Sequence, residues 1–389
     1  MNIAYVTHTR FPTEKAHGKQ IAEVCSSLVE LGHEVTIICP RIRNLITEPA
    51  HDYYNLPDNF GIRYLHHFNA ASARWIPGAF RFIVLMYFYR FALRKFLNSQ
   101  NYDLVYVRSA EVLRTLVHLK TPVAAEMHTI PRRRRKNLVS ALNKCAKVIC
   151  LTRPLKEELG SMGVATSNMI VEGDGVRLDR FSNLDLVENV RAELSLPRDR
   201  AIIGYVGSFV TRNTIEKGIL ELIHAISILK KEGAKVTGCI VGGPISWKVK
   251  YLRVARDLEL TEEDIIFKDR VAADKVPSIL NACDVLVYPA PKTDHPFFQR
   301  DTSPLKLFEY LAAAKPIVCA DILPLRDVVD ESSVYFAGAG DPESFASAIR
   351  KAINETDQDS KKRKEKQNEL ALWYSWKSRM SRTIKSITQ

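Results

Sequence analysis

The sequence predicts an α/β protein built from two doubly wound domains, and three observations indicate this class. Short runs of apolar and β-branched residues are typical of strands that are buried in parallel sheets. Amphipathic helical stretches separate these runs, as they do in βαβ units. The whole pattern occurs twice in 389 residues, and a chain of this length holds two domains at about 150 residues or more per domain.

The first series of strands and helices lies in the N-terminal half of the chain. A strand is expected over 2–7, directly at the start, and a helical pattern follows over 18–31. Further short apolar runs predict strands over 34–39, 104–107, 123–126 and 148–151. Because these strands are short and continuously apolar, we expect one parallel sheet with helices on both faces.

The second series begins after a polar segment at 181–200, which contains a proline and marks the domain boundary. We therefore place one domain at 1–185 and the other at 186–372. The expected strands of the second domain lie over 202–207, 235–241, 265–267, 285–288 and 316–319. Its expected helices lie over 217–232, 276–281 and 305–313.

Composition excludes several classes of protein. Hydrophobic residues make up 46% of the chain, which excludes general disorder, and the length excludes a small disulfide scaffold. The first ten residues lack the basic and apolar regions of a signal peptide, and no apolar stretch reaches the roughly 18 residues of a membrane span. Seven cysteines form no CxxC pair, and most lie in apolar runs. We expect structural thiols in a reducing cytosol.

The positive charge of the chain is concentrated in one segment. The formal net charge is +12, and residues 71–136 contain 13 basic and 3 acidic residues, so this segment alone contributes +10. A basic chain favours an acidic partner, which can be nucleic acid, anionic lipid or a phosphorylated substrate.

Two glycine-containing turns follow expected strands, where ligands of open α/β sheets bind. Gly18 stands where the first helix is expected to begin, so the backbone could approach an anionic ligand there; a glycine that merely permits the turn is the alternative. In the second domain, Lys217 and Gly218 are expected to open a helix, with Arg212 earlier in the loop. A lysine at this place can neutralise a phosphate, although the spacing does not match a P-loop.

The segment after residue 300 is the richest in candidate site residues. Ser303 and Pro304 form a good helix start with proline at the first helical position, and Asp301 and Glu309 are eight residues apart. Glu309 would lie in the second turn, where a carboxylate could accept hydrogen bonds from neighbouring hydroxyls such as those of a ribose; an ordinary surface acid is the alternative. His128 follows the strand at 123–126 directly, which would place it at the ligand edge of the sheet, although a structural histidine is the commoner case.

Five segments in this order resemble the retaining glycosyltransferases of family four, which have the GT-B fold. The segments are FPTEKAHGKQIAEVCSSLVELGHEVTIICP, GDGVRLDRF, YVG followed by EKG, DTSPLKLFEYLAAAKPIVCAD and YSW. The resemblance implies two Rossmann-like domains facing a central crevice, with residues 373–389 packing back on the first domain.

The resemblance also implies a role for individual residues. Gly18 would approach the donor diphosphate and Lys217 would pair with it, while Glu309 would hold the nucleotide ribose. Asp301 would lie near the donor sugar, and His128 near the sugar that is transferred.

The backbone of Ser303, Pro304 and Leu305 would complete a phosphate cradle at a helix N-terminus. Two positions depart from the family pattern. Asp301 stands where glutamate is usual, and Ser208 stands where an arginine is common after YVG. Arg212, in the longer loop, could replace that arginine.

A sugar transfer of this kind needs no cofactor, and we expect a nucleotide-sugar donor, a UDP-sugar first, and no metal. Stabilising the departing diphosphate with a lysine and helix N–H groups could supply several kcal/mol. A sugar-nucleotide epimerase on a similar fold is one alternative. A nucleic-acid-binding protein is another, although no RRM, KH or helix-turn-helix pattern occurs and we expect no nucleic-acid partner.

The basic segment indicates how the acceptor is reached. Aromatic residues are interleaved with cations there, which is typical of an interfacial membrane element, while a core helix with an arginine-rich rim is the alternative. We expect an anionic membrane surface and a lipid-linked or polysaccharide acceptor, with the enzyme peripheral on the cytoplasmic, inner face. The residues proposed for this contact are Trp75, Arg81, Arg90, Arg94, Arg132, Arg133, Arg134 and Arg135.

Overall fold

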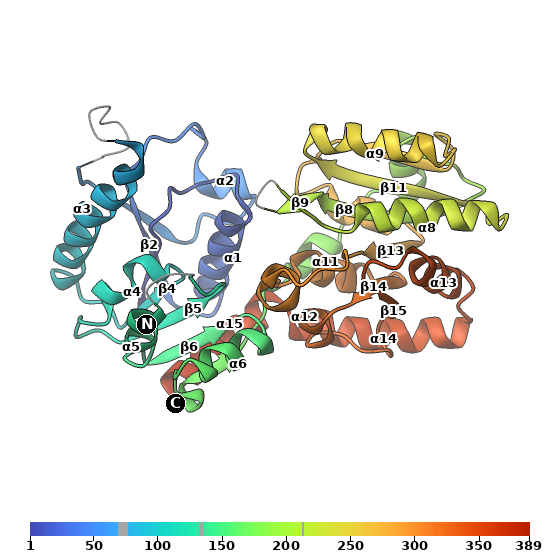
Figure 1. Cartoon of the computed structure of the whole chain (residues 1–389). Coiled ribbons are helices and arrows are strands. Elements are labelled where there is room, and N and C mark those ends of the chain that lie inside the picture. The colour runs from blue at the N-terminus through green and yellow to red at the C-terminus, as the bar shows by residue number, and fades with distance from the viewer. Residues whose placement is uncertain (69–76, 132–134, 212–213) are drawn as a thin grey trace. The chain divides into compact units, whose positions relative to one another are not determined.

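The computed structural model describes residues 1–68, 77–131, 135–211 and 214–389. The chain divides into two compact units, which are coloured by residue number in Figure 1. Unit 1 consists of Met1–Asp174 and Trp376–Gln389, and unit 2 of Gly175–Ser375.

These limits differ from those drawn on the sequence, 185/186 and 372/373, because of local packing. The turn η2 (Leu178–Phe181) packs against helices of unit 2. Near the other limit, the ring of Tyr374 lies 4.9 Å from that of Phe308, which is also in unit 2.

The sheet of unit 1 has seven parallel strands in the order β3-β2-β1-β4-β5-β6-β7. The order reverses between β1 and β4, and the crevice at such a switch point is where doubly wound sheets bind ligands. The strands are β1 (Asn2–Val6), β2 (Glu34–Pro40), β3 (Gly61–Leu65), β4 (Leu104–Val107), β5 (Val123–Met127), β6 (Lys147–Cys150) and β7 (Met169–Val171).

The helices of unit 1 include one from the far end of the chain. The last helix, α15, packs against α1 and β6, which confirms the predicted return of the C-terminus to the N-terminal domain. Helix α4 packs against both α3 and α5. The helices are α1 (Ala16–Glu30), α2 (Ala50–Tyr54), α3 (Gly78–Asn98), α4 (Ala110–Leu116), α5 (Arg135–Leu142), α6 (Arg153–Ser161) and α15 (Trp376–Thr388), with the short turn η1 (Thr166–Asn168).

The sheet of unit 2 has six parallel strands in the order β12-β11-β8-β13-β14-β15. Its switch point lies between β8 and β13, beside a small antiparallel hairpin, β9 and β10. The strands are β8 (Ala201–Ser208), β9 (Val210–Thr211), β10 (Ile215–Glu216), β11 (Val236–Gly243), β12 (Ile265–Lys268), β13 (Val285–Tyr288), β14 (Ile317–Asp321) and β15 (Tyr335–Gly338).

The helices of unit 2 form two packed groups, as the opposite directions of the crossovers require. Helix α8 packs with α9 and α13, whereas α10 packs with α7 and α11, and α11 packs with α14. The helices are α7 (Val187–Glu193), α8 (Ile219–Lys231), α9 (Ile245–Asp257), α10 (Val276–Ala282), α11 (Leu305–Ala313), α12 (Leu323–Arg326), α13 (Pro342–Ile353) and α14 (Asp357–Trp373), with the π-helical turn η3 (Phe297–Asp301).

The fold confirms the prediction of two doubly wound α/β domains. All seven cysteines are buried and free, as expected for core thiols. Five of the described strands were not predicted. Strands β3, β7 and β15 each extend an existing sheet at its margin, and β9 and β10 form the separate two-stranded hairpin. Strand β3 exposes most of its residues and β7 has only three, so neither has the continuous apolar run that marks a central strand.

Candidate active site

The site candidates of unit 2 gather where β8 ends. Lys217 lies two residues before α8 and does not open it, so the sequence-based helix start is wrong by two residues. The reason is local capping: the Glu216 carboxylate accepts hydrogen bonds from the amides of Gly218 and Ile219, at 2.6 and 2.7 Å. Because these amides are already bonded, the Lys217 side chain, and not the backbone of the turn, is the group predicted to bind an anion here.

Gly218 is required where the turn meets the neighbouring strand end. Its φ is +86°, and a Cβ there would lie 2.5 Å from the amide nitrogen of Ala290, just after β13. Only glycine accepts both the left-handed backbone and this contact. The glycine therefore fixes Lys217 next to the carboxyl end of β13.

The Lys217 ammonium lies in an apolar environment. It is 5.7 Å from the centre of the Phe297 ring, in η3, and burial lowers the pKa of Lys217 to about 8. No carboxylate of a described residue forms an ion pair with it. A lysine held in this way gains its counter-charge when an anion binds.

Lys306, which the sequence did not single out, reaches the same edge of the sheet from the second position of α11. Its ammonium donates a hydrogen bond to the Tyr205 hydroxyl and lies 3.9 Å from the centre of that ring. Lys306 is three residues before Glu309, so helical spacing could have indicated that the two share a face.

Asp301 is the last residue of η3, and its carboxylate pairs with a neighbour. The Arg300 Nε lies 2.5 Å from Asp301 Oδ1, and both side chains are largely buried. The predicted acidic side chain near the donor sugar is thus charge-neutralised within its own turn.

The start of α11 differs slightly from the prediction. Pro304 precedes the helix, which begins at Leu305, so Pro304 is the N-cap and not the first helical residue. Within the predicted phosphate cradle, the Leu305 amide donates to the Ser303 carbonyl at 3.0 Å, and a proline has no amide to offer. Glu309 lies in the second turn of α11, as predicted, and is partly buried.

Ser208 ends β8, at the place where the family pattern has arginine. Its hydroxyl donates to the Val210 carbonyl at 2.7 Å, and its carbonyl accepts from the Tyr205 hydroxyl at 2.7 Å. The side chain therefore stabilises the hairpin that follows and brings no charge. Arg212, its suggested replacement, lies outside the described residues.

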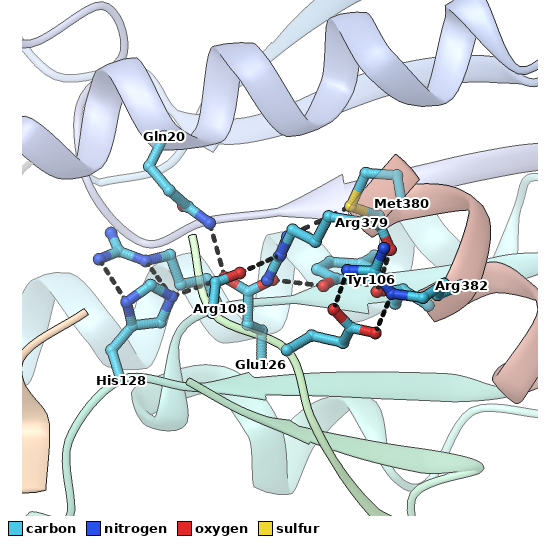
Figure 2. Close-up of polar contacts among 11 residues, drawn as sticks. Gln20, Tyr106, Arg108, Glu126, His128, Arg379, Met380 and Arg382 are labelled. Carbon is cyan, nitrogen blue, oxygen red and sulfur yellow. Dashed lines mark hydrogen bonds and ion pairs between the residues drawn. The ribbon is translucent and has the colours of Figure 1, made fainter. Parts of the chain in front are cut away.

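In unit 1, His128 belongs to a buried polar network, shown in Figure 2. Its Nε2 lies 2.6 Å from Oε1 of Glu126 and accepts from Arg108 Nε at 2.8 Å, and its Nδ1 lies 3.0 Å from a second Arg108 guanidinium nitrogen. Arg108 therefore contacts both ring nitrogens, and Glu126 contacts Nε2.

Glu126 is the centre of this network and is fully buried. Gln20 donates to its Oε1 at 2.6 Å, the Tyr106 hydroxyl donates to its Oε2, and Arg379 of α15 donates to Oε2 at 2.7 Å. Arg379 also donates to the Gly173 carbonyl at 2.6 Å. Helix α15 is therefore tied to the sheet by a paired charge and not by apolar packing alone.

The network fixes the charge of its two titratable members. Burial, aided by the Arg108 charge, lowers the pKa of His128 to about 4, so the imidazole is neutral at physiological pH. Burial by itself would raise the pKa of Glu126, but Arg379 and the hydrogen bonds from His128 and Tyr106 hold it well below its usual range. A neutral histidine thus lies against an ionised carboxylate.

Gly18 is the third residue of α1, and a close contact explains why it is glycine. A Cβ there would lie 2.1 Å from the Tyr54 hydroxyl and 2.6 Å from Thr13 Cγ2. The Tyr54 hydroxyl in turn donates to the Thr13 carbonyl at 2.8 Å. The glycine is needed by this internal packing, whatever the helix N-terminus binds.

Helix α3 lies within the basic segment, and it has two faces. One face is buried in the core of unit 1, including Tyr89 and Leu93. The other exposes large apolar side chains, up to 71% for Phe91. The exposed side chains of this face are Phe80, Ile83, Tyr87, Phe88 and Phe91. Phe82 is also exposed, but it lies seven residues before Tyr89, on the packed face, and its ring contacts that of His8.

The cations proposed for membrane contact are only partly described. Arg81 and Arg90 are partly exposed and Arg94 is exposed on α3, and Arg135 is exposed at the start of α5. Arg90 also donates to the Glu111 carbonyl at 3.0 Å. Four further candidates lie outside the described residues: Trp75, Arg132, Arg133 and Arg134.

No described helix is both long and apolar enough to cross a membrane. In the same part of the chain, no three His, Cys, Asp or Glu side chains lie together as a metal would require.

Several residues of these sites were missed on the sequence. Glu126 could have been found, because it is two residues before His128 and alternate strand residues share a face. Arg379 gives no such signal, since it is 253 residues away from its partner Glu126. Tyr205 also gives no signal in the sequence, because nothing there distinguishes it from other core aromatic residues. Its contact with Lys306 is seen only in the structure.

Two family models match the chain, one in each unit. A model described as Glycosyltransferase Family 4 matches residues 18–180, and one described as Glycosyl transferases group 1 matches residues 200–355. No curated protein sequence matches the chain.

Solved structures of similar fold cover nearly all of the chain. A glycosyltransferase from Rickettsia africae ESF-5 has 18% identity and a TM-score of 0.77, and the match covers 100% of this chain and 97% of that one. HepE of Anabaena, in complex with UDP and glucose, has 14% identity and a TM-score of 0.72, covering 100% and 99%. WaaG, a glycosyltransferase involved in lipopolysaccharide biosynthesis, has 15% identity and a TM-score of 0.64, covering 99% of each chain.

The family matches agree with the geometry of the two units. Both sheets are parallel and doubly wound, and the last helix returns to the first unit, as in the GT-B fold. The predicted resemblance is therefore confirmed: this chain belongs to the family-four glycosyltransferases, retaining enzymes that transfer a sugar from a nucleotide-sugar donor.

Proposed function

We propose that the chain moves a sugar from a UDP-sugar to a hydroxyl group of a lipid-linked or membrane-surface acceptor, at the cytoplasmic, inner face of a membrane. The observation that carries the acceptor half of this proposal is the exposed aromatic face of α3 with its arginines. The donor half rests on the cationic strand edge of unit 2.

For the donor, HepE of Anabaena supports a uridine nucleotide, because that protein has been crystallised with UDP and with UDP-glucose. In this chain Lys217 would pair with the diphosphate, and Glu309 would accept hydrogen bonds from the ribose. Asp301 would lie near the sugar, with its charge already balanced by Arg300. The backbone at the start of α11 would contribute the positive end of a helix dipole.

The chemistry would place charge where these groups can stabilise it. Sugar transfer passes through an oxocarbenium-like state while a nucleoside diphosphate leaves with increasing negative charge. An ammonium group preorganised in an apolar site stabilises this charge by several kcal/mol, on the order of 3 kcal/mol for one good donor. Attack on the face from which the diphosphate departs would retain the configuration of the sugar.

In unit 1, His128 would contact the sugar or acceptor as a neutral imidazole. Both oxygens of Glu126 are already engaged, by His128 and Gln20 on one side and by Tyr106 and Arg379 on the other. Glu126 is therefore a positioning residue, which together with Arg108 sets the orientation of the His128 ring.

For the acceptor, α3 supports a membrane surface. Exposed aromatic rings suit the boundary between headgroups and acyl chains, and arginines suit anionic headgroups. The opposite face of the same helix is packed in the core, so the aromatic face is held on a fixed support. The similar fold of WaaG, with its part in lipopolysaccharide biosynthesis, is consistent with this kind of acceptor.

A flotation experiment tests the membrane proposal. The protein is mixed with vesicles of phosphatidylglycerol and phosphatidylcholine, or of phosphatidylcholine alone, and the bound fraction is measured. We expect binding to the anionic vesicles, and a loss of at least about tenfold for Phe80→Ser combined with Phe91→Ser, since each buried phenylalanine contributes more than about 1 kcal/mol.

The matched control carries serine at two exposed leucines of unit 2, Leu323 and Leu372, which are 60% and 61% exposed. This variant should bind like the wild type. Equal binding of both double variants, or no preference of the wild type for anionic vesicles, would refute the membrane proposal and leave the donor half standing.

A further inference from the structure

We propose that Lys306 is the second cation of the donor site, and that its ammonium holds the diphosphate in place of the arginine that Ser208 replaces. This inference rests on the nucleotide-sugar donor proposed above. It concerns a residue for which neither the sequence motifs nor the family pattern suggested a role.

The first argument is position. A Cβ at Gly207 would lie 2.8 Å from Cε and 3.0 Å from Nζ of Lys306, so the lysine runs along the last residues of β8. Its ammonium donates to the Tyr205 hydroxyl, which itself donates to the Ser208 carbonyl at 2.7 Å. The Lys306 charge therefore lies beside the residue at which the family pattern places an arginine.

The second argument is the surroundings of the ammonium. It lies over two aromatic rings, 3.9 Å from the centre of Tyr205 and 5.3 Å from the centre of Tyr288. Among the described residues no carboxylate forms an ion pair with it. Aromatic faces attract a cation but do not neutralise its charge. A bound anion would therefore be favourable at this site.

The third argument is the second lysine. Burial lowers the pKa of Lys306 well below its usual range, and the charge of Lys217 lowers it further, whereas the charges of Glu309 and Glu216 raise it. Two like charges in an apolar site are unfavourable, and proteins tolerate them mainly where they have a function. A diphosphate supplies at least two negative charges to this pair.

The lowered lysine pKa also predicts that ligand binding is accompanied by proton uptake. A lysine with only a packing role would not cause this uptake. If the lysine pair is incompletely protonated in the free protein, a bound diphosphate must restore the missing protons. Binding then takes up protons from the buffer, in an amount that depends on pH and on Lys306. A lysine that only fills space beside Tyr205 would give no such uptake.

Calorimetric titration with UDP at pH 8.5, in two buffers of different ionisation enthalpy, measures both the affinity and the proton uptake. We expect proton uptake by the wild type. Lys306→Met should weaken UDP binding by tenfold or more and reduce the uptake. Lys306→Arg should keep most of the affinity, because arginine stays charged, yet also reduce the uptake.

The matched control is Lys315→Met. Lys315 is another partly buried lysine of unit 2 whose pKa burial lowers, but it precedes β14 and so lies at the opposite edge of the sheet. This variant should bind UDP with unchanged affinity and unchanged proton uptake. Thermal unfolding of each variant without UDP shows that unit 2 is folded.

The outcomes separate the two proposals. A wild type that binds none of UDP, GDP and ADP refutes the nucleotide-sugar donor and, with it, this role of Lys306. A wild type that binds UDP while Lys306→Met binds it with equal affinity and equal proton uptake refutes the Lys306 assignment alone. Equal weakening of uridine and UDP binding in Lys306→Met would also overturn it, since uridine has no phosphate.

Discussion

Buried charges lie near the ligand edge of both sheets, but the buried carboxylate of unit 1 is paired within the chain, whereas two buried lysines of unit 2 are not. In unit 1, Glu126 is compensated by Arg379 and by hydrogen bonds from its neighbours. In unit 2, Lys217 and Lys306 face aromatic rings and form no ion pair with a described carboxylate. The comparison teaches that the network of unit 1 is closed by its own residues, whereas the two lysines of unit 2 agree with the proposal that this site binds an anion.

The largest expected effect is on the stability of unit 1. Arg379→Met should leave Glu126 buried without its counter-charge and lower the free energy of unfolding of unit 1 by about 3–5 kcal/mol. Hydrogen exchange of the amides in β5 under increasing urea measures this unit separately.

The matched control is Arg382→Met on the same helix. Its partner Glu172 keeps contact with water, and the Arg382 side chain is 22% exposed, so a smaller loss is expected. If both variants lowered the free energy of unfolding equally, the buried Glu126–Arg379 pair would contribute no more to stability than the partly exposed pair.

The next effect is on catalysis by unit 2. Lys217→Ala should lower the rate of UDP release from the donor by roughly 10²–10³-fold, because charge stabilisation in the transition state is lost. Glu309→Ala should also lower this rate, by about 10²-fold, because the hydrogen bonds proposed between the Glu309 carboxylate and the donor ribose would be lost. Lys315→Ala serves as the control and should retain activity. Near-normal rates in both site variants would refute the site assignment.

The smallest expected effect is on the stability of unit 2. Its sign is unusual, because removing the Lys217 charge should raise the stability of the folded unit. Because the pKa of Lys217 is about 8 in the folded protein and about 10.5 when unfolded, the unfolded chain binds more protons between these values. Lysine 217 therefore makes unit 2 more stable as pH rises from about 8 to 10.5. Diphosphate affinity should change in the opposite direction, since it needs the charged lysine.

The measurement compares thermal unfolding of the wild type and Lys217→Met across this pH range without ligand. We expect the variant to melt higher at pH 7, by roughly 2–4 °C per kcal/mol of relieved charge burial, and the difference to shrink toward pH 10.5. Other groups titrate in both proteins and cancel in the difference. A variant that is less stable at pH 7 would show that Lys217 has an internal counter-charge.

The sequence by itself predicted the fold class and the central strands of both sheets. These predictions are confirmed, because parallel strands are continuously apolar. The site roles of Lys217, Glu309, Asp301 and His128 stay predictions. The marginal strands were missed because half-exposed or very short segments lack that pattern.

Only the tertiary structure decided which charges are compensated. Glu126 and Arg379 are 253 residues apart, and Tyr205 and Lys306 are 101 apart, so no local pattern predicts that they meet. Helix α3 teaches the same lesson, because apolar residues occur all around it among its cations, and only packing showed which aromatic residues remain exposed. Local sequence determines which elements form, but the energy of a buried charge depends on neighbours that the fold brings from elsewhere in the chain.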